Sequence, residues 1–241
     1  MHERRRPDDS QKRTGTLYLV GMPIGHPDDL GRRALSILRT VDIIATEDPR
    51  ATQRLLRHYR TSAALTSYGP VKIKEKVALL IQQLRFGRSV ALVSDCGSPV
   101  VADPGSLLVA AAHRHRIPIR SIPGPSALTA AIAAAGFHGD AGHFYGNLPA
   151  TNTALKRKLT ATLKHREPVV LFVEAEYLTS VVSFIAQESP RRSIAVCENL
   201  GLASECVRKG TARRIARIVE PIQPSETITI VIGPGPRSGR R

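Results

Sequence analysis

The chain has 241 residues, a length that suits one large domain or two small ones. Its hydrophobic content of 42% is enough for a real core, whereas aromatic residues make up 4% and Trp is absent. The chain therefore lacks the rows of aromatic rings on which single-stranded nucleic acid often stacks. A net charge of +15 favours anionic partners, with nucleic acid first among them.

The cysteines, histidines and apolar segments limit the compartment and the kind of site. The 3 cysteines match neither a zinc site nor a Cys-x-x-Cys pair, and their low, odd number is typical of a reducing, cytoplasmic environment. The longest apolar stretches are too short to span a bilayer and the charged first residues do not resemble a secretory signal, so no membrane partner is expected. The histidines are dispersed, with His113 and His115 expected on the surface, and no metal site is predicted.

Strand patterns alternate with helical patterns in the first half of the chain. Apolar strands are predicted at 16–20, 41–46, 89–93 and 117–122. Helices are predicted at about 30–38, 49–58, 74–85, 107–115 and 126–135, the last with Ser126 as its capping residue. Continuous apolar strands that alternate with helices indicate an α/β fold with a mostly parallel sheet covered on both faces.

The segment 136–150 changes character and is interpreted as a link to a second domain, because it is rich in Gly and lacks periodicity. After it, helices are predicted at 155–165, 178–187 and 211–219, and strands at 169–174, 193–198, 205–209 and 227–232. The predicted organisation is a disordered basic tail at 1–14, an N-terminal α/β domain at 15–137, a C-terminal α/β domain at 145–233 and a tail at 234–241.

Loops rich in Gly and Pro follow three predicted strands, at 21–25, 94–99 and 123–127. In an open parallel sheet, ligands bind beyond the carboxyl ends of the strands, and glycine lets the backbone approach them closely. One such loop alone is typical of an ordinary tight turn, but three in one half of the chain favour a cofactor pocket. None of them matches a G-x-G-x-x-G fingerprint or a P-loop, which argues against nicotinamide binding and nucleotide hydrolysis.

Charged residues suggest where a substrate binds. Glu47, Asp48 and Arg50 come directly after a predicted strand, where they could grip a substrate or remove a proton; the alternative is an N-capping aspartate beside a solvated arginine. Two basic clusters could face phosphates or form solvated helix faces. They are Lys156, Arg157, Lys158, Lys164, His165 and Arg166, and Arg208, Lys209, Arg213, Arg214 and Arg217.

Taken together, these segments resemble the tetrapyrrole methylase superfamily from about Gly15 to Ile232. The strongest matches are Pro23-Ile24-Gly25, Glu47-Asp48-x-Arg50, Ser94-Asp95-x-Gly97-Ser98-Pro99, Asp103-Pro104-Gly105 and Pro123-Gly124-Pro125-Ser126-Ala127. Within the superfamily, the chain is most similar to bacterial members that methylate a cytidine ribose 2′-hydroxyl of 16S ribosomal RNA in the small ribosomal subunit.

The resemblance implies two α/β domains, S-adenosylmethionine held in the cleft between them, ribosomal RNA as substrate and a homodimer. Asp48 or Glu47 is predicted to accept the proton of the hydroxyl, with Arg50 orienting that group or binding phosphate. The implied cofactor-binding residues are Pro23, Asp95, Gly97, Ser98, Ser126 and Ala127 from the first domain and its last loop, and Ala175, Leu202 and Ile228 from the second domain.

The chain departs from the family pattern at Pro49, at 67–70 and at 174–178, positions that are interpreted as facing the substrate. Two alternatives stay open at this point. One is the methylation of a small anionic molecule such as a tetrapyrrole, which the positive charge also suits. The other is a non-catalytic, RNA-binding relative of the same fold.

Overall fold

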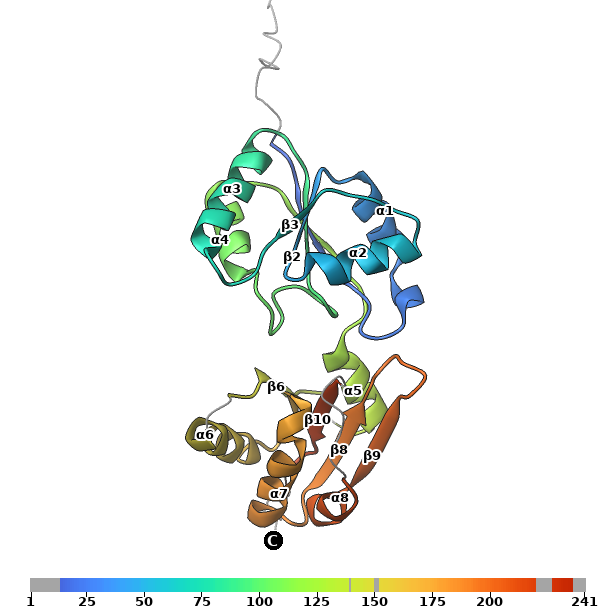
Figure 1. The fold of residues 1–241 in the computed structure, drawn as a ribbon. Coiled ribbons are helices and arrows are strands. Elements are labelled where there is room, and N and C mark those ends of the chain that lie inside the picture. The colour runs from blue at the N-terminus through green and yellow to red at the C-terminus, as the bar shows by residue number, and fades with distance from the viewer. Residues whose placement is uncertain (1–13, 139, 150–151, 220–226, 236–241) are drawn as a thin grey trace, which may run out of the picture. The chain divides into compact units, whose positions relative to one another are not determined.

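The computed structural model describes residues 14–138, 140–149, 152–219 and 227–235 (Figure 1). The chain divides into two compact units, Met1–Pro23 with Pro27–Gly124, and Ile24–His26 with Pro125–Arg241. The described part of each unit contains a five-stranded sheet, which confirms the predicted α/β fold. Within the described ranges, no helix has both the length and the apolar character needed to cross a membrane.

The sheet of the first unit is parallel throughout, with the strand order β3-β2-β4-β1-β5. Its strands are β1 (Leu17–Val20), β2 (Ile43–Thr46), β3 (Leu65–Ser67), β4 (Val90–Val93) and β5 (Ile119–Ile122). Its helices are α1 (Arg32–Thr40), α2 (Pro49–His58), α3 (Ile73–Arg85) and α4 (Ser106–Arg114), and a short 3-10 helix covers Pro27–Asp29.

Alternate residues of these strands fill two apolar cores, one on each face of the sheet. Leu17 of β1 and Leu92 of β4 point to the side of α3 and α4, whereas Val20 and Val93 point to the side of α1 and α2. Figure 1 shows the two helix pairs on opposite faces of this sheet. Because both faces are covered, the central strands β1 and β4 and most of β2 are apolar along their length, which is why the sequence pattern predicted them.

The sheet of the second unit is mixed, with the strand order β6-β7-β10-β8-β9. Only β6 and β7 pair in parallel, whereas β10 lies antiparallel between β7 and β8, and β9 is antiparallel to β8. The strands are β6 (His143–Asn147), β7 (Val169–Val173), β8 (Ser193–Glu198), β9 (Cys206–Thr211) and β10 (Ile228–Ile232). The helices are α5 (Ala127–Ala135), α6 (Asn152–Leu163), α7 (Leu178–Glu188) and α8 (Ala212–Ile218), with a 3-10 turn at Ala175–Tyr177.

The second sheet also separates two cores. Odd-numbered residues of β7 point into one core and Val170 points into the other. Leu171 packs with residues of α6, α7 and α8, whereas Val170 packs with Ala131 and Ala135 of α5. Ile24, from the loop after β1, joins the core beside α5. A Cβ atom on Gly25 would lie 2.7 Å from the Leu200 carbonyl oxygen, so glycine is required where this loop meets the second unit.

Three features differ from the sequence-based expectations. The predicted link at 136–150 contains a strand, β6, whose His, Gly and Asn residues conceal the strand pattern. The three-residue strand β3 was also missed, because it is too short to show a periodicity. The predicted N-terminal domain extends to residue 137, whereas α5 packs within the second unit and the contact boundary falls after Gly124. The predicted tails at 1–14 and 234–241 lie almost entirely outside the described residues.

Candidate functional site

The carboxyl ends of the parallel strands meet at one edge of the first sheet. Val20 at the end of β1 is in register with Val93 of β4 on one side and Ile122 of β5 on the other. Strand β2 lies beside β4 and places Glu47 and Asp48 at the same edge. The prediction that the Gly- and Pro-rich loops follow strands is therefore confirmed, and the structure adds that the three strands β4, β1 and β5 are neighbours.

Backbone hydrogen bonds connect the loop after β1 to the loop after β4. The Met22 N–H donates to the Gly97 carbonyl at 2.8 Å, and the Gly97 N–H donates to the Pro23 carbonyl at 3.3 Å. Gly97 has a φ of 74°, in the left-handed region that favours glycine. The Ser94 hydroxyl donates to the carbonyls of Cys96 and Gly97 at 2.9 and 3.1 Å. Pro23 and Gly97, both predicted to contact the cofactor, are thus held side by side.

A glycine pair brings the loop after β1 against the loop after β5. A Cβ atom on Gly21 would lie 2.7 Å from the Gly124 backbone nitrogen, and one on Gly124 would lie 2.7 Å from the Gly21 carbonyl oxygen. Neither position has room for a side chain. The two loops therefore pack backbone against backbone at this edge of the sheet, which fixes their positions relative to each other.

Asp48 has a structural role that the sequence left open. Its Oδ1 accepts a hydrogen bond from the Arg50 N–H at 2.7 Å, and it is the N-cap of α2, with Pro49 at the first helical position. Its own N–H donates to Oδ1 of Asp95 at 3.1 Å. The capping interpretation is thus confirmed in geometry, and Pro49 suits a first-turn position, where a missing N–H costs nothing. Arg50 and Glu47 are exposed.

Asp103 is a further acidic group at this edge, and its role was not foreseen. Burial, together with the negative charges of Glu47 and Asp95, raises the pKa of its carboxyl group to about 7. A carboxyl group that titrates near neutral pH is suited to proton transfer. The sequence signal was its position in the same strand-end loop as Asp95, but its depth below the surface depends on the fold.

The loop that carries Asp95 and Asp103 is conformationally constrained. Val100 and Ala102 have φ values of 75° and 56°, which non-glycine residues seldom adopt, and Gly105 has a φ of 143°. A Cβ atom on Gly105 would lie 2.8 Å from side-chain atoms of Leu92 and Val100. Such strain is common where a loop positions functional groups, and it accompanies the acidic cluster here.

In the second unit, three predicted cofactor residues lie at one edge of the mixed sheet. Ile228 begins β10 and is in register with Val173 at the end of β7 and Glu198 at the end of β8. Ala175 follows β7 and Leu202 follows β8, so both leave the sheet at the edge where Ile228 enters it. Leu202 is 41% exposed, whereas Ile228 is buried.

Ser126 and Ala127 stand at the start of α5, as predicted. Ser126 occupies the N-cap position, but its side chain makes no capping hydrogen bond, so the predicted side-chain cap was wrong. Its carbonyl oxygen accepts instead from the Ala130 N–H and the Thr129 hydroxyl.

The first basic cluster borders a surface pocket in the second unit. Arg157 and Lys158 of α6, with Tyr145, Asn147 and Leu148, line a pocket of about 460 Å³. The Lys158 ammonium group donates to the Asn147 carbonyl at 2.6 Å, and burial lowers its pKa. Cations beside an aromatic ring and a polar side chain are the groups that an anionic, base-bearing ligand would meet.

The second basic cluster is divided between structural and solvent-facing roles. Arg208 forms an ion pair with the buried Glu198. The Lys209 ammonium donates to the Gly136 carbonyl at 3.1 Å and lies 4.3 Å from the centre of the Phe137 ring. Arg213, Arg214 and Arg217 on α8 are exposed. Only these last three match the predicted phosphate-facing or solvated face.

Tyr68, in one of the segments that depart from the family pattern, is part of the apolar core. Tyr68 is 1% exposed and packs among residues of α3, α4 and β4. Ser67 and Pro70 of the same segment are exposed, so the interpretation that 67–70 faces the substrate stays a prediction for these two residues. His113 and His115 are exposed, as predicted.

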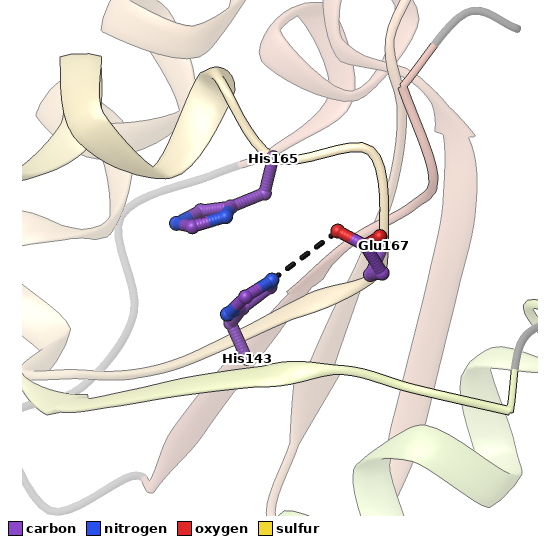
Figure 2. A group of neighbouring side chains, drawn as sticks. All are labelled: His143, His165 and Glu167. Atoms are coloured by element: carbon purple, nitrogen blue, oxygen red, sulfur yellow. Dashed lines mark hydrogen bonds and ion pairs between the residues drawn. The ribbon is translucent and has the colours of Figure 1, made fainter.

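A group of potential metal ligands was missed. His143, His165 and Glu167 lie together in the second unit (Figure 2), although the dispersed histidines predicted no metal site. His143 is distant in the sequence from His165 and Glu167, so only the fold brings it beside them.

The strand-end loops and the two five-stranded sheets define a two-unit α/β protein, and the comparisons assign it to a family of methylases. The family model of the Tetrapyrrole (Corrin/Porphyrin) Methylases matches residues 16–216, so the chain belongs to this family.

Several similar curated proteins share the name Ribosomal RNA small subunit methyltransferase I. The protein from Thermotoga maritima is 36% identical over 219 residues, covering 90% of this chain and 98% of that protein. The protein from Micromonospora olivasterospora is 36% identical over 223 residues, covering 91% of this chain and 71% of its own length. The Xylella fastidiosa protein is 43% identical over 166 residues, covering 68% and 59%.

Solved structures share the fold at lower identity. Diphthine synthase has a TM-score of 0.71 at 17% identity, covering 91% of this chain and 90% of that chain. A uroporphyrin-III C-methyltransferase from Thermus thermophilus, complexed with S-adenosylhomocysteine, has a TM-score of 0.60 at 21% identity, covering 91% and 97%. These similarities support the fold, but they do not identify the substrate.

Proposed function

We propose that this chain is an S-adenosylmethionine-dependent methyltransferase that methylates a cytidine ribose 2′-hydroxyl of 16S ribosomal RNA in the small ribosomal subunit. The observation that carries the proposal is the set of interlocked strand-end loops around Pro23, Gly97 and Asp95, in a chain that spans 98% of a relative named as a ribosomal RNA methyltransferase. A ribosomal substrate places the proposed reaction in the cytoplasm.

The residues at this edge suit the proposed cofactor. The Gly21 and Gly124 contact brings two backbone segments together without side chains between them, and the exposed Asp95 offers a carboxylate that a hydroxyl or an ammonium group can meet. When bound, the cofactor supplies an electrophilic methyl group, so the protein mainly binds and positions. The residues assigned to cofactor binding remain Pro23, Asp95, Gly97, Ser98, Ser126, Ala127, Ala175, Leu202 and Ile228.

Removal of the ribose proton is assigned to the acidic cluster. Glu47 and Asp48 remain candidates, with Arg50 orienting the hydroxyl or binding a neighbouring phosphate. Asp103 joins them, because a pKa of about 7 matches the working range of a general base. Asp48 is the weaker candidate, since the Arg50 N–H already occupies one of its oxygens.

The substrate is tested by offering labelled S-adenosylmethionine together with 30S subunits, naked 16S ribosomal RNA, or a tetrapyrrole carboxylic acid. Label in a cytidine ribose of 30S subunits supports the proposal. Label in the tetrapyrrole alone would establish the small-molecule alternative. Absence of both labelling and calorimetric binding at millimolar cofactor would identify a non-catalytic relative.

Salt dependence gives a second test of the RNA assignment. Each phosphate contact adds close to one unit to the slope of log affinity against log salt, so RNA affinity should fall by an order of magnitude or more between about 50 and 200 mM salt. The affinity for a small acidic substrate would change far less with salt.

The family resemblance also leads us to propose a homodimer, which light scattering on the purified protein would check.

A further inference from the structure

A cluster of imidazole and carboxylate groups lies in the second unit, separate from the acidic edge of the first sheet. His143 begins β6, whereas His165 and Glu167 lie between α6 and β7. The parallel pairing of β6 with β7 puts His143 opposite Val169, and the backbone N–H of His143 donates to the Pro168 carbonyl at 2.8 Å. The fold thereby brings the start of one strand beside the approach to the next.

The side chains converge from two sides (Figure 2). One potential ligand atom from each of the three lies within 4.8 Å of the others. Nε2 of His143 is 3.2 Å from a Glu167 carboxylate oxygen, and these two side chains are 38% and 45% exposed. The two imidazole rings are stacked, with their centres 3.7 Å apart and their planes at 29°. Because the His143 and Glu167 side chains are partly exposed, ions in solution can reach the cluster.

The His165 ring is oriented by a hydrogen bond at its far nitrogen. The Tyr145 hydroxyl lies 2.6 Å from His165 Nε2. When Nε2 donates to that hydroxyl, the lone pair of the ring belongs to Nδ1. Imidazole ligands of metal ions commonly donate their other N–H in this way, which fixes both the tautomer and the ring orientation.

We propose that His143, His165 and Glu167 bind a divalent transition-metal ion of the zinc class, with His143 Nε2, His165 Nδ1 and one Glu167 oxygen as ligands and Tyr145 orienting His165. Two imidazoles and a carboxylate are a donor set that zinc accepts, with metal–ligand distances of about 2.0–2.2 Å. Tetrahedral geometry at those distances sets ligand atoms roughly 3.4 Å apart. The His143–Glu167 separation of 3.2 Å already meets this requirement.

Binding requires the stacked His143 and His165 rings to rotate so that their in-plane lone pairs converge on the ion, and a contact of up to 4.8 Å must shorten by little more than an ångström. Three protein ligands leave a position open for water or for a donor from another molecule. A bound ion would tie the start of β6 to the segment before β7. The inference does not depend on the methyltransferase assignment.

The test is calorimetric titration of zinc into tag-free, chelator-treated full-length protein, with cobalt absorbance as a second readout. We expect one ion per chain and an intense tetrahedral cobalt spectrum. The H143A/H165A double variant should lose that spectrum and bind zinc at least 100-fold more weakly. Y145F should weaken binding by up to about tenfold, since it removes an orienting partner and no ligand.

The matched control is the H113A/H115A variant, which removes two exposed histidines of the first unit. It should bind zinc as the unmodified chain does. Thermal melting of each metal-free variant checks folding, and zinc should raise the melting temperature of the control but not that of H143A/H165A. Equal zinc affinity in H143A/H165A and the unmodified chain, or loss of the cobalt spectrum in the control alone, would overturn the proposal.

Discussion

The backbone N–H of Asp48 donates to the Asp95 carboxylate at 3.1 Å, which ties the loop after β2 to the loop after β4. Asp95 therefore holds the proposed proton-accepting region and the proposed cofactor region in one arrangement. Because the same Asp48 caps α2, a change at Asp95 affects the start of a helix as well as a binding surface.

Asp95→Ala is expected to weaken S-adenosylhomocysteine binding at least tenfold, about 1.4 kcal/mol, because it removes a carboxylate and loosens the 47–50 loop. Calorimetry measures the effect. Asp42→Asn is the matched control: Asp42 accepts hydrogen bonds from Ser89 at the amino ends of β2 and β4, so this variant should lose stability without losing affinity. Equal affinity losses in both variants would refute the role of Asp95.

Asp103→Asn is expected to change the pH dependence of stability. In the folded chain the pKa of Asp103 is raised from 3.8 to about 7, so the folded state keeps a proton that the unfolded state releases between about pH 4 and 7. The contribution of this group to stability therefore falls as pH rises through that window. Asn removes this decline, and denaturant midpoints at pH 4.5 and 7.5 should lie closer together than in the unmodified chain.

The same variant tests the proposed proton transfer. If Asp103 is the base, Asp103→Asn should lower the single-turnover methylation rate by 10²–10⁴-fold and remove a rise in rate near pH 7. Glu47→Gln and Asp48→Asn serve as parallel variants of the same cluster. An unchanged rate and pH profile in Asp103→Asn would leave Glu47 as the leading candidate.

Gly124→Ala is expected to destabilise the first unit by about 1–3 kcal/mol, because the new methyl group would lie 2.7 Å from the Gly21 carbonyl oxygen. Gly69→Ala is the control, since a Cβ atom at Gly69 meets no atom within 4 Å. Its free energy of unfolding should change by no more than about 0.5 kcal/mol. Urea denaturation compares the two, and equal losses would show that the close backbone approach is not required.

Tyr68→Phe is expected to leave stability unchanged or to raise it by up to about 1 kcal/mol. The Tyr68 hydroxyl is the one buried side-chain polar atom, among the residues described, without a hydrogen-bond partner. Burial raises the pKa of the phenol, an effect that the Leu108 backbone opposes without reaching hydrogen-bond geometry. Phe keeps the packing and removes an unsatisfied polar atom. A loss above about 1 kcal/mol in thermal or urea unfolding would contradict this account.

The sequence predicted the elements whose patterns are local. Strands such as β1 and β4 are apolar along their length because helices cover both faces, so a short window reveals them. The insertion of β10 between β7 and β8 depends on pairing between distant segments, and β6 carries polar residues within a strand. Neither leaves a periodic signal.

The candidate site likewise contains residues that the sequence revealed and residues that only the fold brings together. The glycine and proline loops and Asp95 were visible as strand-end residues, whereas the raised pKa of Asp103 depends on burial and on the charge of Glu47 from another loop. The His143 and His165 pair likewise depends on the register of β6 with β7. Chemistry carried by a single loop can be predicted from the sequence, but chemistry assembled across the fold cannot.

Residues Ile24–His26 belong to the second unit although their neighbours on both sides in the chain belong to the first. During synthesis, Ile24 leaves the ribosome long before the strands of its core, β7, β8 and β10, exist. The second unit therefore cannot complete its packing from its own contiguous sequence. A fragment that begins at Pro125 would lack Ile24. Expressed without the preceding residues, the second unit should therefore have an incomplete core.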